Sequence, residues 1–324
     1  MTPAVRDPAL GSDSPRPLNR FVATTVTNPA LAAQTRLAAP SAAVQGSLAC
    51  CAVVLVAFSL AAARGGLVRN LLELGGIVLL MVVPALVPAA LFHERGSVQR
   101  RDAALMLPWG ILMVALLKAA ILTATARRFP LRDGLWRRCD QHLGIDVPRI
   151  LAWAAHHAPA EHLLADCYGL LAPMMLAAFL LPALLGKRRA AERFVLGNAL
   201  GFVLALPCIL LLPAVGPWVA WHFPPAPVQH NWELGLRAVR DGNFAADTSL
   251  IASVCLPSFH AFWAVLSAQA LSVFRWMRIP AVALAALVAV STLTTGWHYG
   301  VDVIAGLLLA AIAMILAGLI TKNQ

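Results

Sequence analysis

Charged residues are scarce in this chain. Asp, Glu, Lys and Arg make up 12% of its 324 residues, whereas hydrophobic residues make up 60%, and the mean hydropathy is +0.76. Because soluble domains usually contain about 25% charged residues, this composition excludes an ordinary water-soluble protein. The sequence predicts an integral membrane protein of the all-α class, a polytopic bundle of membrane-spanning helices.

Acidic residues are scarcer than basic ones, with 15 Asp and Glu against 25 Lys and Arg and a net charge of +10. The basic residues are dispersed through the segments between apolar stretches and do not gather on one soluble face. This distribution argues against a nucleic-acid partner and is typical of topology signals. The expected partners are therefore membrane lipids.

Disulfide bonds and a signal peptide are not expected either. Of six cysteines, only Cys139 lies outside a predicted membrane span, so the sequence contains no disulfide framework. The first 46 residues are rich in Ala, Pro, Ser and Thr and lack the early apolar run of a cleaved signal peptide. We expect residues 1–46 to be a disordered cytoplasmic tail.

Apolar windows of about 20 residues, the length that crosses a bilayer, are abundant. They predict about eight transmembrane helices, with a six-helix catalytic core at the C-terminal end. Residues 47–160 form an accessory region with an amphipathic helix in "VPRILAWAAHH", and residues 161–324 form the membrane domain that carries the chemistry. The eight windows are residues 47–63, 72–92, 103–125, 163–185, 194–215, 254–274, 277–295 and 299–320.

The basic residues predict the orientation of these spans. In an eight-span arrangement, 14 Lys and Arg residues lie on the side of the N-terminus and 10 lie on the opposite side. The positive-inside rule makes the first side cytoplasmic, although six arginines of the segment 126–162 then face outward. We expect a multi-pass inner-membrane protein. The Pro- and Trp-rich segment between the fifth and sixth spans is expected to be a structured loop over the site, at the periplasmic side.

Two polar motifs interrupt the apolar C-terminal third. They are "LPSFH", which ends at His260, and "STLTTGWHYGVD", which contains His298 and Asp302. Ionisable residues at the edge of a membrane-embedded region are costly and indicate function. His298 and Asp302 are four residues apart, a spacing that places them on one face of a helix. A hairpin of the sixth and seventh spans brings both motifs to the same membrane face, so the three residues form a candidate catalytic group.

The first motif also predicts an anion-binding helix start. Pro257 suits the first turn of the sixth span, where its missing N–H costs nothing. The following amides and the Ser258 hydroxyl can then hold a phosphate group at the positive end of the helix. In this arrangement a neutral His298 oriented by Asp302 attacks phosphorus, and His260 donates a proton to the leaving oxygen. This reaction requires no cofactor and no metal.

These residues resemble the type 2 phosphatidic acid phosphatase superfamily over about residues 160–320. "PSFH", followed about 40 residues later by "HYGVD", carries the resemblance, especially to the branch that contains inositol phosphorylceramide synthases, and the similarity takes in "LPAVGPW" and "LRAVRDG". The resemblance implies a helical membrane enzyme that acts on a lipid phosphate. It also implies that His298 is the nucleophile, His260 the acid and Asp302 the orienting residue.

Two features differ from the phosphatase branch of that superfamily. The Lys and Arg-Pro of its first motif are absent before the sixth span, and Ser291-Thr292 stands where its third motif begins Ser-Arg. The phosphotransferase branch also lacks the first motif, so its absence here modestly favours a phosphotransferase over a phosphatase. Arg240, in "LRAVRDG", is our candidate for the missing phosphate-binding cation, because Arg makes bidentate contacts to phosphate oxygens.

The leading hypothesis is an integral-membrane lipid phosphate phosphohydrolase that forms a phosphohistidine at the periplasmic face. Its alternative is a phospho-headgroup transferase of the inositol phosphorylceramide synthase type, in which an acceptor hydroxyl replaces water. Two non-enzymatic hypotheses stand beside these. In the first, His260, His298 and Asp302 supply three ligands of a zinc site. In the second, the protein is a catalytically inactive scaffold, as the two differences from the phosphatase motifs suggest.

Overall fold

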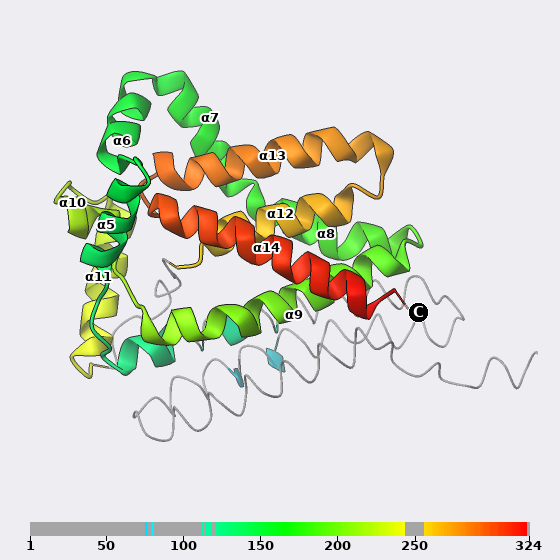
Figure 1. The fold of residues 1–324 in the computed structure, drawn as a ribbon, viewed down its shortest axis with the longest axis horizontal. Helices are drawn as coiled ribbons and strands as arrows, with labels where there is room; N and C mark the ends of the chain where they lie inside the picture. Colours follow the sequence, from blue (N-terminus) through cyan, green and yellow to red (C-terminus); the bar gives the residue numbers. More distant parts are fainter. Residues whose placement is uncertain are drawn as a thin grey trace, which may run out of the picture. The chain divides into compact units, whose positions relative to one another are not determined.

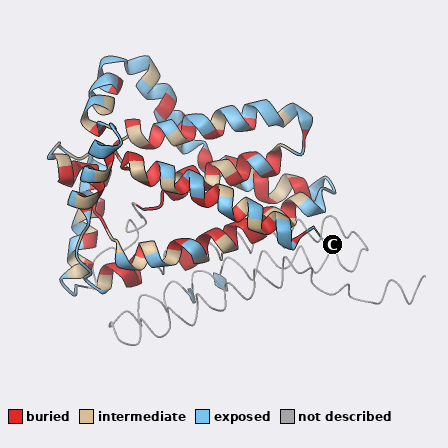
Figure 2. Cartoon of the chain, viewed as in Figure 1, coloured by how far each residue is buried: buried red, intermediate tan, exposed pale blue. Residues whose placement is uncertain are grey.

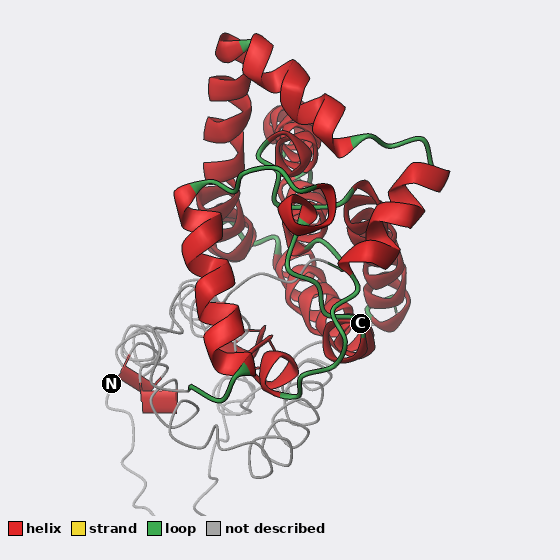
Figure 3. Ribbon diagram, turned by 90° about the vertical axis from the view of Figure 1, so that its left-hand side faces the viewer, coloured by secondary structure: helices red, strands yellow, loops and turns green. Residues whose placement is uncertain are grey.

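The structure is a computed structural model that describes residues 121–243 and 256–322, together with nine isolated positions between residues 75 and 119. The tail expected over residues 1–46 and the first two predicted spans lie outside the described residues, apart from a few isolated positions, as does most of the third. The described part contains helices and loops and no strand, which confirms the all-α prediction (Figures 1 and 3).

Ten helices follow one another between Asp133 and Ile320 in the described segments, and we use the labels of Figure 1 for them. They are α5 (Asp133–His142), α6 (Val147–His156), α7 (Ala158–Gly169), α8 (Leu171–Leu184), α9 (Arg188–Leu211), α10 (Pro217–Trp221), α11 (Pro227–Arg240), α12 (Phe259–Leu271), α13 (Arg275–Thr294) and α14 (Gly300–Ile320).

Four helical stretches are long and apolar enough to cross a membrane. They are Ala158–Leu184, which joins α7 to α8, and the helices α9, α13 and α14. Their outer faces remain apolar, with Ile279 80% and Ile315 62% exposed, as expected of surfaces that face lipid. The predicted helical membrane fold is thus confirmed.

The prediction of a full span over residues 254–274 was wrong in length. Helix α12 has 13 residues, fewer than the about 20 that cross a bilayer. It begins only after Ser258, whose side-chain oxygen accepts a hydrogen bond from the Ala261 N–H, and it ends before Ser272. Pro257 therefore precedes the helix and does not occupy its first turn. Because the segment is apolar overall, its composition did not predict that the helix begins after Ser258 and ends before Ser272.

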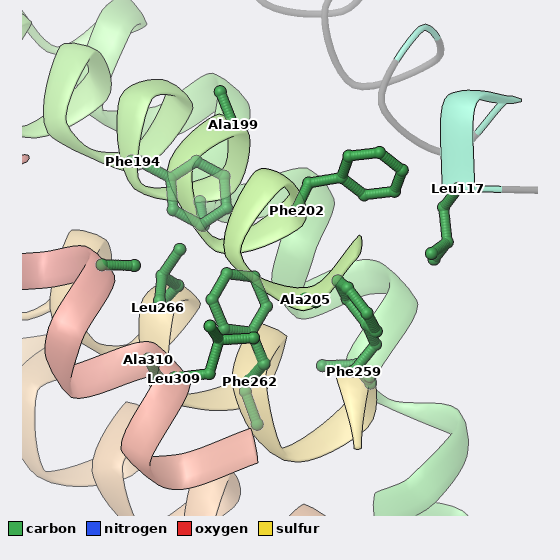
Figure 4. Packing of buried hydrophobic residues seen from close by; sticks show 14 of the residues in the cluster. Leu117, Phe194, Ala199, Phe202, Ala205, Phe259, Phe262, Leu266, Leu309 and Ala310 are labelled. Carbon is green, nitrogen blue, oxygen red and sulfur yellow. The ribbon is translucent and has the colours of Figure 1, made fainter. Parts of the chain in front are cut away.

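The apolar core lies where α9, α12 and α14 face one another (Figure 2). In Figure 4, Phe194 of α9 lies near Leu266 of α12, and the ring centroids of Phe202 of α9 and Phe259 of α12 are 6.3 Å apart, so the two helices approach each other closely. Gly201 permits this approach, because a Cβ at that position would lie 2.2 Å from the Phe262 ring. Small residues at helix contacts are typical of membrane bundles, in which close packing replaces hydrophobic exclusion from water.

A layer of shorter helices lies at one end of the bundle, at the left of Figure 1. It contains α5, α6, α10 and α11. Helix α6 confirms the helix predicted in "VPRILAWAAHH". The Pro- and Trp-rich segment, predicted as a structured loop, instead contains the two helices α10 and α11. Each begins with a proline, Pro217 or Pro227, at a position where proline favours helix initiation. Figure 3, which faces this end, shows loops connecting the ends of the helices.

Candidate active site

The residues of the second motif, "STLTTGWHYGVD", lie at the end of α13, in its connection to α14 and in the first turn of α14. Gly296, with φ +71°, ends the turn after α13, and His298 donates its backbone N–H to the Thr292 carbonyl at 3.3 Å. Tyr299 is the N-cap of α14, and Asp302 lies in its first turn. His298 therefore precedes the helix, and its contact with Asp302 is not the contact within a helix that the spacing predicted.

One carboxylate oxygen of Asp302 contacts both the start of α14 and the His298 ring. Its Oδ2 accepts a hydrogen bond from the Tyr299 backbone N–H at 3.0 Å and lies 3.5 Å from His298 Nδ1. An acidic residue in the first turn is favoured by the helix dipole, which explains why the sequence forms this arrangement locally. The 3.5 Å separation exceeds that of a well-formed hydrogen bond, as is common in sites without substrate. Both side chains are almost fully buried, His298 at 2% exposure.

His260 joins this pair from the first turn of α12. Its ring lies 5.6 Å from the His298 ring, centroid to centroid, in an edge-on arrangement. The Tyr168 ring of α7 stacks on the other side of His260 at 4.4 Å. The structure thus brings His260, His298 and Asp302 together at one end of the bundle, from segments about 40 residues apart in the chain.

The two motifs are also joined through their backbones. The Ser258 N–H donates to the Asp302 carbonyl oxygen at 2.9 Å. A Cβ on Gly306, one turn further along α14, would lie 2.3 Å from the Ser258 carbonyl oxygen, so glycine is required for this approach. The Ser258 side chain is fully buried and caps α12. The structure therefore gives Ser258 a structural role at the place where sequence analysis predicted a phosphate ligand.

Two acidic residues of α5 hold the start of α14, and sequence analysis did not single them out. Asp140 accepts hydrogen bonds from the N–H groups of Gly300 and Val301, and Asp133 lies 2.9 Å from the Tyr299 hydroxyl. Their spacing of seven residues, two helical turns, was the available signal, since it places both carboxylates on one face of α5.

Burial changes the acidity of both α5 carboxyl groups. It raises the pKa of Asp140 to about 6, although hydrogen bonds from Val301 and Gly300 act in the opposite direction. The nearby charge of Asp302 adds to the increase. Burial also raises the pKa of Asp133, against the stabilising hydrogen bonds from Gly216, Val215 and Tyr299. A carboxylate removed from water is harder to ionise, and only part of that cost is offset by amide donors.

A backbone contact to the segment before α5 holds Arg240. It is the last residue of α11, and its Nη2 donates to the Phe129 carbonyl oxygen at 3.0 Å. Burial and the neighbouring charges of Arg128 and Arg237 lower its pKa. Nη1 is buried and has no hydrogen-bond partner in the described part of the chain. The role of Arg240 as the phosphate-binding cation stays a prediction.

The described residues contain no group of three or more His, Cys, Asp or Glu residues placed to hold a metal ion. His260, His298 and Asp302 are close together, but they do not converge on a common point as zinc ligands do. The zinc site considered from the sequence is therefore not formed by these residues in this structure.

Comparison with known protein families gives one match. The family model of the PAP2 superfamily matches residues 136–316, more than half of the chain. The chain belongs to the PAP2 superfamily. Neither a curated protein nor a solved structure matches it significantly. Members of the PAP2 superfamily are phosphatases and phosphotransferases, so the chain falls in the class of enzymes that act on phosphoric esters.

The matched region includes every residue of the candidate site. The matched region begins within α5. It therefore contains most of α5 and all of α6, although we assigned both helices to an accessory region that ends at residue 160. The PAP2 match thus includes Asp140 of α5 together with both histidines, whereas Asp133 lies just before it.

Proposed function

We propose that this PAP2 protein cleaves lipid phosphates through a phosphohistidine formed on His298. The observation that carries the proposal is the convergence of His260, His298 and Asp302 at one end of a membrane bundle. His260 and His298 lie with ring centroids 5.6 Å apart, and Asp302 faces Nδ1 of His298. This leaves Nε2 of His298 as the nucleophilic nitrogen.

The reaction proceeds in two steps. Nε2 of His298 attacks phosphorus, the ester P–O bond breaks, and protonated His260 transfers its proton to the departing lipid oxygen. Asp302 stabilises the imidazolium that forms, without itself taking a proton. Neutral His260 then removes a proton from water as the water oxygen attacks phosphorus. The P–N bond breaks, phosphate leaves, and His298 returns to its neutral form.

Phosphate charge is neutralised in this proposal by groups at the start of α12 and by arginine. The helix dipole and the amides of the first turn attract the anion, and the hydroxyl hydrogen of Ser258 donates to it while Oγ accepts from Ala261. Arg240, with an Nη1 that has no described partner, supplies positive charge to the incoming lipid. Because Arg240 positions charge and takes no part in bond cleavage, Arg240→Ala is expected to reduce activity less than His298→Ala.

The site is proposed to face the periplasm of an inner membrane, because the opposite side carries 14 of the Lys and Arg residues. The layer of α5, α6, α10 and α11 then lies on the outer side. This layer also supports the second candidate, transfer of a phospho-headgroup. Helices over the site restrict the entry of water, so a lipid hydroxyl can compete for the same phosphohistidine.

The decisive experiment uses the full chain in detergent micelles with a panel of lipid phosphates. Free phosphate and new lipid products are both quantified by mass spectrometry. We expect phosphate release without any added acceptor, an acid-labile phosphate on His298 after rapid quenching, and loss of both in His298→Ala. His156→Ala, which changes an exposed histidine of α6, serves as the matched control and should retain activity. Product formation only with a hydroxylated acceptor would replace hydrolysis by transfer. Full activity of His298→Ala would overturn the proposal.

A further inference from the structure

One face of α5 contacts both the start of α14 and the segment that contains α10. Asp133, Arg137 and Asp140 recur at intervals of four and three residues, so they share that face. Asp133 accepts hydrogen bonds from the N–H groups of Val215 and Gly216, and Arg137 Nη1 donates to the Ala220 carbonyl at 2.8 Å. These contacts join α5 to the segment that contains α10.

The strongest contact of that face is made by Asp140 to α14. Its Oδ2 accepts from the Gly300 N–H at 2.9 Å, and its Oδ1 accepts from the Val301 N–H at 2.7 Å. Asp140 is fully buried, and a Cβ on Gly300 would lie 2.5 Å from the Ile145 side chain. Helix α14 therefore begins in direct contact with α5, with two of its first amides bound to one carboxylate.

His298 depends on this contact for its position. It lies two residues before Gly300 and outside the helix, so its backbone is not held by the α14 hydrogen-bond ladder. Tyr299, between the two, has a hydroxyl 2.9 Å from Asp133 Oδ1. Both residues that follow His298 are thus fixed by α5. Asp302, the partner of His298, lies on the same first turn of α14.

We propose that Asp140 is a positioning residue, and that through it α5 clamps the start of α14 so that His298 faces Asp302 and the substrate phosphorus. This role rests on the proposed phosphohistidine chemistry. It assigns a specific task to a residue that contacts neither the substrate nor the reacting atoms.

Asp140→Asn tests the clamp at the level of single atoms. A carboxylate offers an acceptor oxygen to each of the two amides, whereas an asparagine offers one oxygen and directs its NH₂ group at the second N–H. One hydrogen bond is lost and two donors face each other, while the size of the side chain is unchanged. We expect kcat to fall about 10- to 100-fold with KM nearly unchanged, because positioning of the nucleophile and not binding of the lipid is impaired.

A second measurement does not require activity. His298 is 2% exposed, so diethyl pyrocarbonate should modify it slowly in the wild-type protein. Release of the α14 start should increase its modification rate several-fold in Asp140→Asn, as measured by mass spectrometry at fixed pH. The exposed His156 is the internal standard and should react equally in both proteins.

Asp146→Ala is the matched control variant. Asp146 is a carboxylate of the same end layer, and it caps α6 by accepting a hydrogen bond from the Arg149 N–H and not from an amide of α14. Its loss costs about 1 kcal/mol of helix capping but leaves the clamp intact. Both kcat and His298 modification should equal those of the wild-type protein.

Tyr299→Phe provides the same test if Asp140→Asn does not fold. It removes the hydroxyl that faces Asp133 and retains the ring, and Asp133 keeps its amide donors. A smaller decrease of kcat and a smaller increase of His298 modification are expected. If either folded variant retains full kcat and slow His298 modification, the clamp is disproved. If the wild-type protein cleaves no lipid phosphate, the proposed function fails, whereas the modification rates still decide whether α5 holds His298.

Discussion

The middle of the bundle and its site end are stabilised in different ways. In the middle, α9, α12 and α14 meet through apolar side chains such as Phe194, Phe262 and Leu266, and close packing is the main attraction (Figure 4). At the site end, carboxylates bind backbone amides. Asp140 binds two N–H groups of α14, Asp133 binds those of Val215 and Gly216, and Asp302 binds that of Tyr299.

Packing in the middle of the bundle determines its stability, whereas hydrogen bonds at the site end determine the position of the site residues. Packing in the core is collective, so its loss at one residue lowers the stability of the bundle but leaves the distant site in place. Hydrogen bonds at the site end are directional, so a change of one atom alters where His298 points. Variants in the two regions should therefore differ in whether activity or stability is lost.

Asp302→Asn is expected to have the largest effect. The asparagine oxygen can still accept from the Tyr299 N–H, so the helix start is kept. Its NH₂ group then faces Nδ1 of His298 and stabilises the tautomer whose proton lies on Nε2, the attacking nitrogen. Turnover should fall on the order of 10⁴-fold with little change in thermal stability. Equal losses of activity and stability would contradict the contrast between the two regions.

Phe194→Ala should show the opposite pattern. Phe194 is 1% exposed and packs edge-on against Phe179 at 4.7 Å. The cavity should lower the free energy of unfolding by about 3 kcal/mol and leave kcat of the folded protein unchanged. Leu204→Ala, at a 43% exposed position of the same helix, should change neither quantity much. Denaturation in detergent and activity assays on the same samples make the comparison, and a large loss of kcat in Phe194→Ala would remove the distinction.

Gly306→Ala should affect both regions, because Gly306 joins them. The added methyl group meets the Ser258 carbonyl, a backbone atom that cannot rotate away. Displacing α12 from α14 should reduce kcat about 10- to 100-fold. In Gly318→Ala, on the same helix, the methyl group has no neighbour within 4 Å, so activity should persist and helix stability should rise by up to about 1 kcal/mol. Indistinguishable kinetics of the two variants would refute the close approach.

The pH dependence of stability should show the smallest effect. Burial raises the pKa of Asp140 to about 6 in the folded protein, and the charge of Asp302 contributes to this increase. A raised carboxyl pKa means that the folded state binds the proton more tightly. The stabilisation that Asp140 gives the folded state is therefore fully present below the pKa that this carboxyl group has in the unfolded chain. It is lost as the pH rises through about 6. Asp140→Asn, which cannot titrate, should lose less thermal stability than the wild-type protein between about pH 4 and about pH 7. Asp146→Asn should behave as the wild-type protein, and parallel curves for all three would exclude Asp140 as the titrating group.

Sequence reasoning located the three site residues but not the contacts that hold them. His260, His298 and Asp302 stand out because ionisable residues are rare in an apolar context. Asp133 and Asp140 lie in a polar segment with many charges, where nothing in the composition distinguishes them. The window predicted over residues 299–320 begins one residue before α14, but the position of His298 outside the helix was missed. The four-residue spacing of His298 and Asp302 predicts a helical contact equally well when one of the two residues precedes the helix.

The sequence by itself determined the membrane-spanning helical class, the two motifs and the chemistry of their side chains, because hydropathy and residue type are local properties. Only the tertiary structure decided that α12 is short, that the segment before it forms helices and that α5 binds the start of α14. These outcomes depend on hydrogen bonds such as that between Asp140 and Val301, 161 residues apart. Such a bond forms because a buried carboxylate and the unpaired amides of a helix start satisfy each other, and their meeting is set by packing of the whole chain.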